Sequence, residues 1–109
     1  MQRTEKINQL IKQQLGQIIN KEIDFPDNIL TTITRVETTP DFKTAKIHLT
    51  VLPENLRGTG LEILRKNKKN LHNILKKQLK TKFTPNLKFL IDEQEIYASE
   101  IDRLLDEIK

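Results

Sequence analysis

The sequence lacks cysteine, has one serine and contains few aromatic residues. Without cysteine, the chain can form no disulfide, thiol nucleophile or thiolate metal site. The serine, Ser99, lacks the flanking glycines of a nucleophile elbow. The aromatic residues are Phe25, Phe42, Phe83, Phe89 and Tyr97. They are too few to fill a core, so we expect one built mainly from Ile, Leu and Val.

Long apolar runs are also missing. The first residues contain no apolar signal-peptide region, and no run approaches the roughly 20 residues needed to span a bilayer. We therefore expect a cytoplasmic protein without a membrane anchor. The 109 residues predict a single domain, residues 1–109, with little core to spare for an internal ligand cavity.

Catalytic and metal-binding patterns are weak. His48 and His72 fall in different predicted elements, and neither has an acidic residue at a ligand-like spacing. The segment 58–60, Gly-Thr-Gly, lacks the Gly-Lys-Ser/Thr of a phosphate loop. The acidic pairs 92–93 and 106–107 suit helix ends and solubility. We expect no catalytic residue, no metal and no cofactor, and hence no enzyme.

The charge is unevenly distributed. The whole chain carries a net charge of +4, but residues 65–82 contain no acid. The basic residues of that stretch are Arg65, Lys66, Lys68, Lys69, Lys76, Lys77, Lys80 and Lys82. Residues 92–109 carry seven acidic against two basic residues, a net charge of −5. One side of the protein should therefore attract a polyanion and another should repel it.

A helical period runs through residues 3–23, where apolar side chains recur at steps of three and four. These positions are Ile7, Leu10, Ile11, Leu15, Ile18, Ile19 and Ile23. Gly16 lies inside the pattern at a cost of about 1 kcal/mol relative to alanine. Residues 24–28, which include Pro26, supply the stop.

Two strands are predicted next. Residues 29–38 are rich in Ile, Thr and Val, and residues 45–52 alternate between apolar and polar side chains. In the second strand Lys46, His48 and Thr50 share the wet face. Because only a short turn at residues 39–41 separates the strands, we expect antiparallel pairing.

The second half predicts two central helices, a strand and a last helix. Thr59 and Glu62 fit a capping box, so a helix should begin there. A second apolar period starts at Leu71, with Asn70 as its candidate cap. Two short helices with a bend near residues 67–70 and one long helix both fit. Residues 87–91 read as a strand, and residues 92–109 as a helix capped by Asp92.

These elements predict an α+β domain of order α-β-β-α-α-β-α, with a three-stranded sheet and helices on one of its faces. The lysines of the central helices can follow a nucleic-acid backbone, because each neutralised phosphate releases a condensed counterion. The predominance of lysine over arginine favours phosphate contacts. The scarcity of aromatic residues disfavours stacked single-stranded bases. Two alternatives stay open: a solvated lysine face, and a module that docks an acidic protein partner.

Several segments, in this order and spacing, carry a family resemblance. They are Arg3-Thr4-Glu5-Lys6-Ile7, Leu15-Gly16-Gln17-Ile18-Ile19, the stretch from Asp41 to Leu52, Thr84-Pro85-Asn86-Leu87-Lys88-Phe89, Asp92-Glu93 and Ile101. On these residues the chain resembles the bacterial ribosome-binding factor A family over nearly its full length. The resemblance implies a type II KH-like domain.

The resemblance also implies a function. Proteins of this family are assembly factors without enzymatic activity that bind the small (30S) ribosomal subunit and 16S rRNA. They assist late maturation of the 5′ end of that RNA, and an assembly GTPase is implied in their release. We accordingly expect a monomer whose RNA-binding residues are basic. The candidates are Arg3, Lys6, Arg65, Lys66, Lys68, Lys69, Lys76, Lys77, Lys80 and Lys82.

The chain departs from the family pattern at the bend. Where the family has a short Ala-x-Gly kink between the central helices, this chain has Asn67-Lys68-Lys69. Gln94 and Ala98 replace a serine and a glycine near the last helix. The positive charge has thus increased where the small residues are lost, and the kink geometry becomes a question for the structure.

Overall fold

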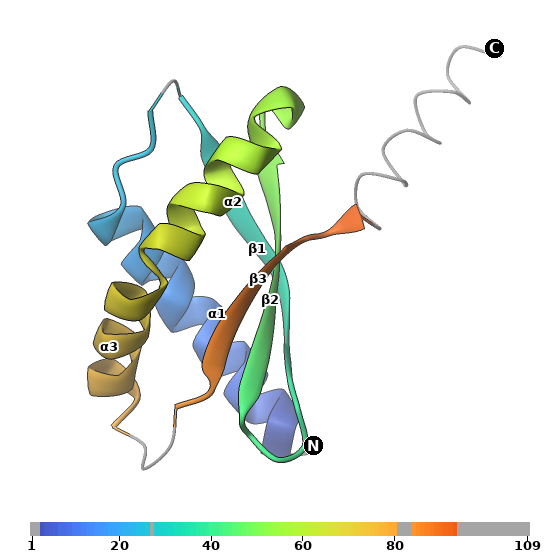
Figure 1. Cartoon of the computed structure of the whole chain (residues 1–109). Coiled ribbons are helices and arrows are strands. Elements are labelled where there is room, and N and C mark those ends of the chain that lie inside the picture. The colour runs from blue at the N-terminus through green and yellow to red at the C-terminus, as the bar shows by residue number, and fades with distance from the viewer. Residues whose placement is uncertain (1–2, 27, 81–83, 94–109) are drawn as a thin grey trace, which may run out of the picture.

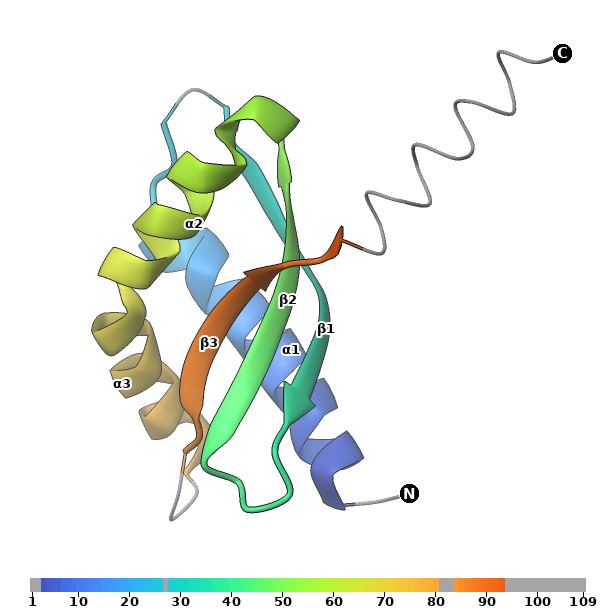
Figure 2. The ribbon, with the colours of Figure 1, turned by 45° about the vertical axis from the view of Figure 1, so that its right-hand side comes forward.

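Three strands form one mixed sheet, and three helices cover one of its faces (Figures 1 and 2). The computed structural model describes residues 3–26, 28–80 and 84–93. The elements are α1 (Arg3–Glu22), β1 (Leu30–Thr38), β2 (Thr44–Leu52), the short 3-10 helix η1 (Glu54–Leu56), α2 (Arg57–Lys66), α3 (Lys68–Leu79) and β3 (Asn86–Ile91). The predicted α+β class is confirmed. The predicted last helix lies outside the described residues, apart from Asp92 and Glu93.

The sheet has the order β1-β2-β3, with β1 antiparallel and β3 parallel to β2. The predicted antiparallel pairing of the first two strands is confirmed. The register breaks between Ile33 and Arg35, so Thr34 is the extra residue of a β-bulge. Its hydroxyl donates to Asp92 Oδ2 at 2.5 Å. This bond joins the end of β3 to β1 across the middle strand.

The core lies between the helices and the sheet and is aliphatic, as expected. Leu15 of α1, Leu71 of α3 and Ile47 of β2 are all fully buried. Phe89 is the one aromatic residue among the buried core side chains of the described chain. Each such side chain contributes about 1.5–3 kcal/mol on burial. The helices are therefore held on one face by the apolar stripes that the sequence predicted.

The turn between β1 and β2 is fixed by side chains. The Thr39 hydroxyl donates to Asp41 Oδ1 at 2.6 Å, and the same oxygen accepts the backbone N–H of Lys43 at 3.0 Å. The Thr39 hydrogen bond, followed by that of Lys43, holds the pKa of the Asp41 carboxyl below its ordinary value. Phe42 has a φ of 61°. The turn predicted at residues 39–41 is confirmed.

The start of α2 differs from the prediction. The helix begins at Arg57, and no side chain caps it, so Thr59 is its third residue and not its cap. The cause lies in η1, whose turn is closed by the Leu56 N–H on Pro53 O at 3.0 Å and continues directly into α2. Gly60 then faces the sheet, because a Cβ at this position would lie 2.9 Å from Val51 Cγ1.

Among the described residues, no helix is both long and apolar enough to cross a membrane.

Candidate nucleic-acid interface

The two central helices meet at Asn67. Its φ of −95° and ψ of 4° interrupt the helical path, and α2 ends at Lys66 while α3 begins at Lys68. The chain changes direction there (Figure 1). The Asn67 side chain donates from Nδ2 to Ile63 O at 2.8 Å, so it closes the end of α2 instead of capping α3. Of the two predicted arrangements, the bent pair is correct. The predicted cap at Asn70 is wrong, because that residue is already inside α3.

A cavity of about 410 Å³ lies at this bend. It is lined by Arg65, Lys66, Lys68, Lys69, His72, Asn86 and Leu87. We call the open concave space lined by these seven residues the bend cavity. The helices supply its cations, and the first two residues of β3 supply the opposite wall. The bend thus concentrates positive charge around a concave surface, where low-dielectric walls focus the field.

His72 forms part of this wall and is held in place. Its Nε2 lies 3.2 Å from the carbonyl oxygen of Thr84. Because a carbonyl only accepts, we assign the proton to Nε2. The bond ties α3 to the segment that leads into β3. Sequence patterns indicated no catalytic or metal role for His72. Its position one helical turn after Lys68 was nevertheless a signal that both residues share a face.

Few acids offset the charge of the bend. Glu62 contacts Lys66, with Oε1 and Nζ 3.5 Å apart and both side chains mostly exposed. Such an exposed i,i+4 pair is worth only about 0.3–0.5 kcal/mol. No other ion pair with a bend cation is found in the described part of the chain. Among the described residues, the backbone N–H groups of Lys68, Lys69 and Asn70 have no hydrogen-bond acceptor. Their partial positive charge adds to that of the side chains.

Four other predicted RNA-binding residues, Lys6, Lys76, Lys77 and Lys80, are not part of the cavity lining. Lys76 and Lys77 are exposed in the last turn of α3, and Lys80 follows with a left-handed φ of 53°. Lys6 is exposed in the first turns of α1, the helix that begins at Arg3. Lys82 lies outside the described residues. Within the described ranges, the structure therefore brings four of the predicted residues together around one cavity.

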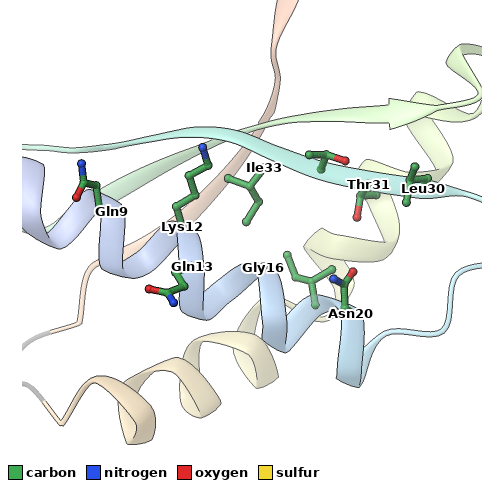
Figure 3. A pocket seen from close by; sticks show the side chains of 10 residues that line it. Gln9, Lys12, Gln13, Gly16, Asn20, Leu30, Thr31 and Ile33 are labelled. Carbon is green, nitrogen blue, oxygen red and sulfur yellow. The ribbon is translucent and has the colours of Figure 1, made fainter.

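A second concavity, of about 470 Å³, lies between α1 and β1. Figure 3 shows Gln9, Lys12, Gln13, Gly16 and Asn20 along α1, with Leu30, Thr31 and Ile33 on the neighbouring strand β1. This concavity is the larger of the two, but among the described residues that line it Lys12 alone is charged. It therefore offers little to a polyanion, and the bend cavity is the better candidate interface.

Side-chain groupings suited to catalysis are sparse. The described residues contain no group of three or more His, Asp or Glu side chains that could hold a metal ion. His48 Nε2 does lie 3.4 Å from Glu37 Oε1, an oxygen that also contacts Arg35 Nη1 at 3.0 Å. This proximity arises across the β1–β2 pair, so spacing along the sequence did not reveal it.

Comparison with known proteins agrees with this fold. The family model described as ribosome-binding factor A matches residues 3–105. Ribosome-binding factor A of Macrococcus caseolyticus is 32% identical over 107 residues, covering 97% of this chain and 94% of the relative. That of Thermodesulfovibrio yellowstonii is 34% identical, covering 98% and 91%.

Structures of related proteins show the same architecture. The crystal structure of ribosome-binding factor A from Thermus thermophilus superposes with a TM-score of 0.73 at 19% identity, covering 83% of this chain and 97% of that one. A homology model of the Thermus thermophilus factor, fitted into a cryo-EM map of a 30S complex, gives 0.68 at 20% identity, covering 76% and 88%. With a family match over almost the whole chain and relatives above 30% identity, the protein belongs to the ribosome-binding factor A family.

Proposed function

We propose that this protein binds the small ribosomal subunit by laying the 16S rRNA backbone against the bend cavity. The observation that carries the proposal is the grouping of Arg65, Lys66, Lys68 and Lys69 around one concave surface. The family name supports the ribosome as the target. A relative has been fitted into a map of a 30S complex, which supports the same subunit.

The chemistry of the bend cavity favours contacts to phosphate over readout of bases. Three of its four cations are lysines, which bind phosphate as point charges. Among the described residues that line it, none is Phe, Tyr or Trp, so these residues offer little platform for stacking. Affinity would come from counterion release and depend on salt, with a slope of about −0.7 to −0.9 per neutralised phosphate. Such contacts recognise the shape of a folded RNA.

The cellular role that we propose is non-enzymatic assistance of late 16S rRNA maturation at the 5′ end. The same resemblance favours cytoplasmic action as a monomer, with release that involves a GTPase. In a strain that lacks this protein, 16S precursor should accumulate. The wild-type chain should remove the precursor, whereas the binding-deficient variant below should not. If that variant removed the precursor, maturation would not depend on RNA binding at the bend cavity.

Co-sedimentation with purified small subunits at low and moderate salt tests the binding step. The wild-type protein should travel with the subunits, and the Lys68→Glu/Lys69→Glu variant should stay at the top of the gradient. Lys12→Glu/Lys21→Glu in α1 reverses the same charge away from the bend and should still bind. If the wild-type protein never sediments with subunits, the proposal is wrong.

An acidic protein partner is the competing function, and the exposed lysines of α3 are what favour it. A pull-down from lysate before and after nuclease treatment separates the two. Capture of ribosomal material that disappears with the RNA supports our proposal. A single acidic protein that survives nuclease would replace it.

A further inference from the structure

Two lysines stand side by side on the sheet face that the helices leave open. Lys46 of β2 and Lys88 of β3 are direct partners in the parallel ladder, and both are exposed. Like charges directly opposite each other in a sheet destabilise it. Because side chains alternate along each strand, both lysines lie on the open face, whereas their neighbours Ile47 and Phe89 are buried on the other face. The two lysines thus repel each other and lower the stability of the fold. An uncharged polar residue at either position would remove this repulsion.

The acids around this pair are already engaged. Glu37 is the β1 partner of Lys46, but its carboxylate contacts Arg35 at 3.0 Å and lies 3.4 Å from His48. Asp92 is 4% exposed and accepts the Thr34 hydroxyl. No ion pair to Lys46 or Lys88 is found within the described ranges. The pair therefore presents two cations to solvent.

The pair is continuous with the bend cavity. Asn86 and Leu87 line the cavity, and Lys88 is the next residue of the same strand. β3 is an edge strand of the described sheet, and Figure 2 shows it between the α2–α3 pair and β2. In the described part of the chain, β3 thus lies between the bend cavity and the open face of the sheet.

We propose that the RNA-binding surface continues over the edge of β3, and that Lys46 and Lys88 bind phosphates of the RNA strand that leaves the bend cavity. This inference rests on the proposed function, and it adds two contacts that the basic stretch of residues 65–82 does not include. A polyanion that bridges the two ammonium groups removes their repulsion, so the arrangement costs stability in the free protein and gains affinity in the complex.

The test compares Lys46→Gln/Lys88→Gln with Lys12→Gln/Lys21→Gln, which removes the same charge from α1. Affinity for purified small subunits is measured across a salt series. The open-face variant should bind more weakly, and its salt slope should fall by about 0.7–0.9 per lost contact. Its melting temperature should equal or exceed that of the wild type, since a repulsion is removed. The α1 variant should retain the wild-type slope.

The possible outcomes distinguish a failure of this inference from a failure of the proposed function. If wild-type protein binds and Lys68→Glu/Lys69→Glu abolishes binding, but the open-face variant keeps the wild-type affinity and slope, this inference is wrong and the function stands. If no variant matters because the wild type does not bind, the function itself fails. A defect seen with intact subunits but not with protein-free 16S rRNA would assign the open face to a ribosomal protein and overturn the RNA contact.

Discussion

Helix α1 and the α2–α3 pair pack on the same face of the sheet, yet they differ in continuity, charge and packing. α1 runs without interruption for 20 residues and carries four basic and two acidic residues. The α2–α3 pair is broken at Asn67 and carries seven basic residues against one acid. Gly16 of α1 has open space around it, whereas Gly60 of α2 lies against Val51.

The difference separates scaffold from interface. The apolar stripe of α1 packs against β1 and α3, so this helix supports the rest of the fold. The α2–α3 pair has to pass close to β2, bend, and bring its cations to the start of β3. Gly60 permits the close approach to β2, and the break at Asn67 brings the cations to the bend cavity. Substitutions in the two regions should therefore have different consequences, and the following predictions test that expectation.

The largest effect is expected from charge reversal at the far end of α3. Lys76→Glu/Lys77→Glu/Lys80→Glu should abolish co-sedimentation with small subunits, because it replaces three of the candidate RNA-binding cations with charges that repel phosphate. We expect a loss of at least about tenfold in affinity. Since glutamate near a helix C-terminus also opposes the helix dipole, the triple glutamine variant is the control, and it should bind with an intermediate affinity. If the reversed variant binds normally, the interface is confined to the bend.

The second effect concerns the close approach of α2. Gly60→Ala would place a methyl group 2.9 Å from Val51 Cγ1, and Val51 is only 2% exposed and stiff at χ1. Overpacking of this kind costs about 1–3 kcal/mol, partly offset by the roughly 1 kcal/mol that alanine gains in a helix. Chemical denaturation should show a net loss of unfolding free energy. Gly58→Ala is the matched control in the same helix, since no atom lies within 4 Å of its added carbon. If the two variants were equally stable, the expected overpacking of Ala at position 60 against Val51 would be wrong.

Much of this architecture could be predicted from the sequence. The period of α1 and the alternation of β2 are local patterns, and the observed bounds differ from the predicted ones by a residue or so. The start of α2 could not be found in the same way. Thr59 and Glu62 form a valid capping signal, but the turn after Pro53 starts the helix earlier. A local motif was overruled by the turn that precedes it.

The candidate site was predicted only in part, for a related reason. The four bend cations are close in sequence, so a charge count identified them. Asn86 and Leu87 complete the cavity from a strand that follows later in the chain. Lys46 and Lys88 are adjacent because of the register of the parallel β2–β3 pair, and spacing along the chain does not reveal that register. The sequence shows where the charged residues occur along the chain. Which of them lie on the same surface can be seen only in the folded structure.

The third prediction addresses the bend itself. Asn67→Ala removes the 2.8 Å hydrogen bond to Ile63 O, which should cost about 0.5–1.5 kcal/mol. Because alanine also favours a continuous helix, the cations on either side of residue 67 should lose their fixed arrangement. The measurable result is a small fall in melting temperature together with weaker subunit binding. If stability falls and binding does not change, the bend is a structural feature and does not position the cations.

The smallest effect is expected in α1, and it can contradict the comparison most directly. Gly16→Ala adds a carbon with no atom within 4 Å and removes a helix-interior glycine, so the unfolding free energy should rise by about 0.5–1 kcal/mol. Thermal melts should show this increase, and subunit binding should not change if α1 serves only as scaffold. Gly16 also lines the groove between α1 and β1 (Figure 3). A variant that is more stable but binds subunits less well would therefore show that a partner enters this groove. Part of the interface would then lie in the groove between α1 and β1, which lacks the clustered cations of the bend.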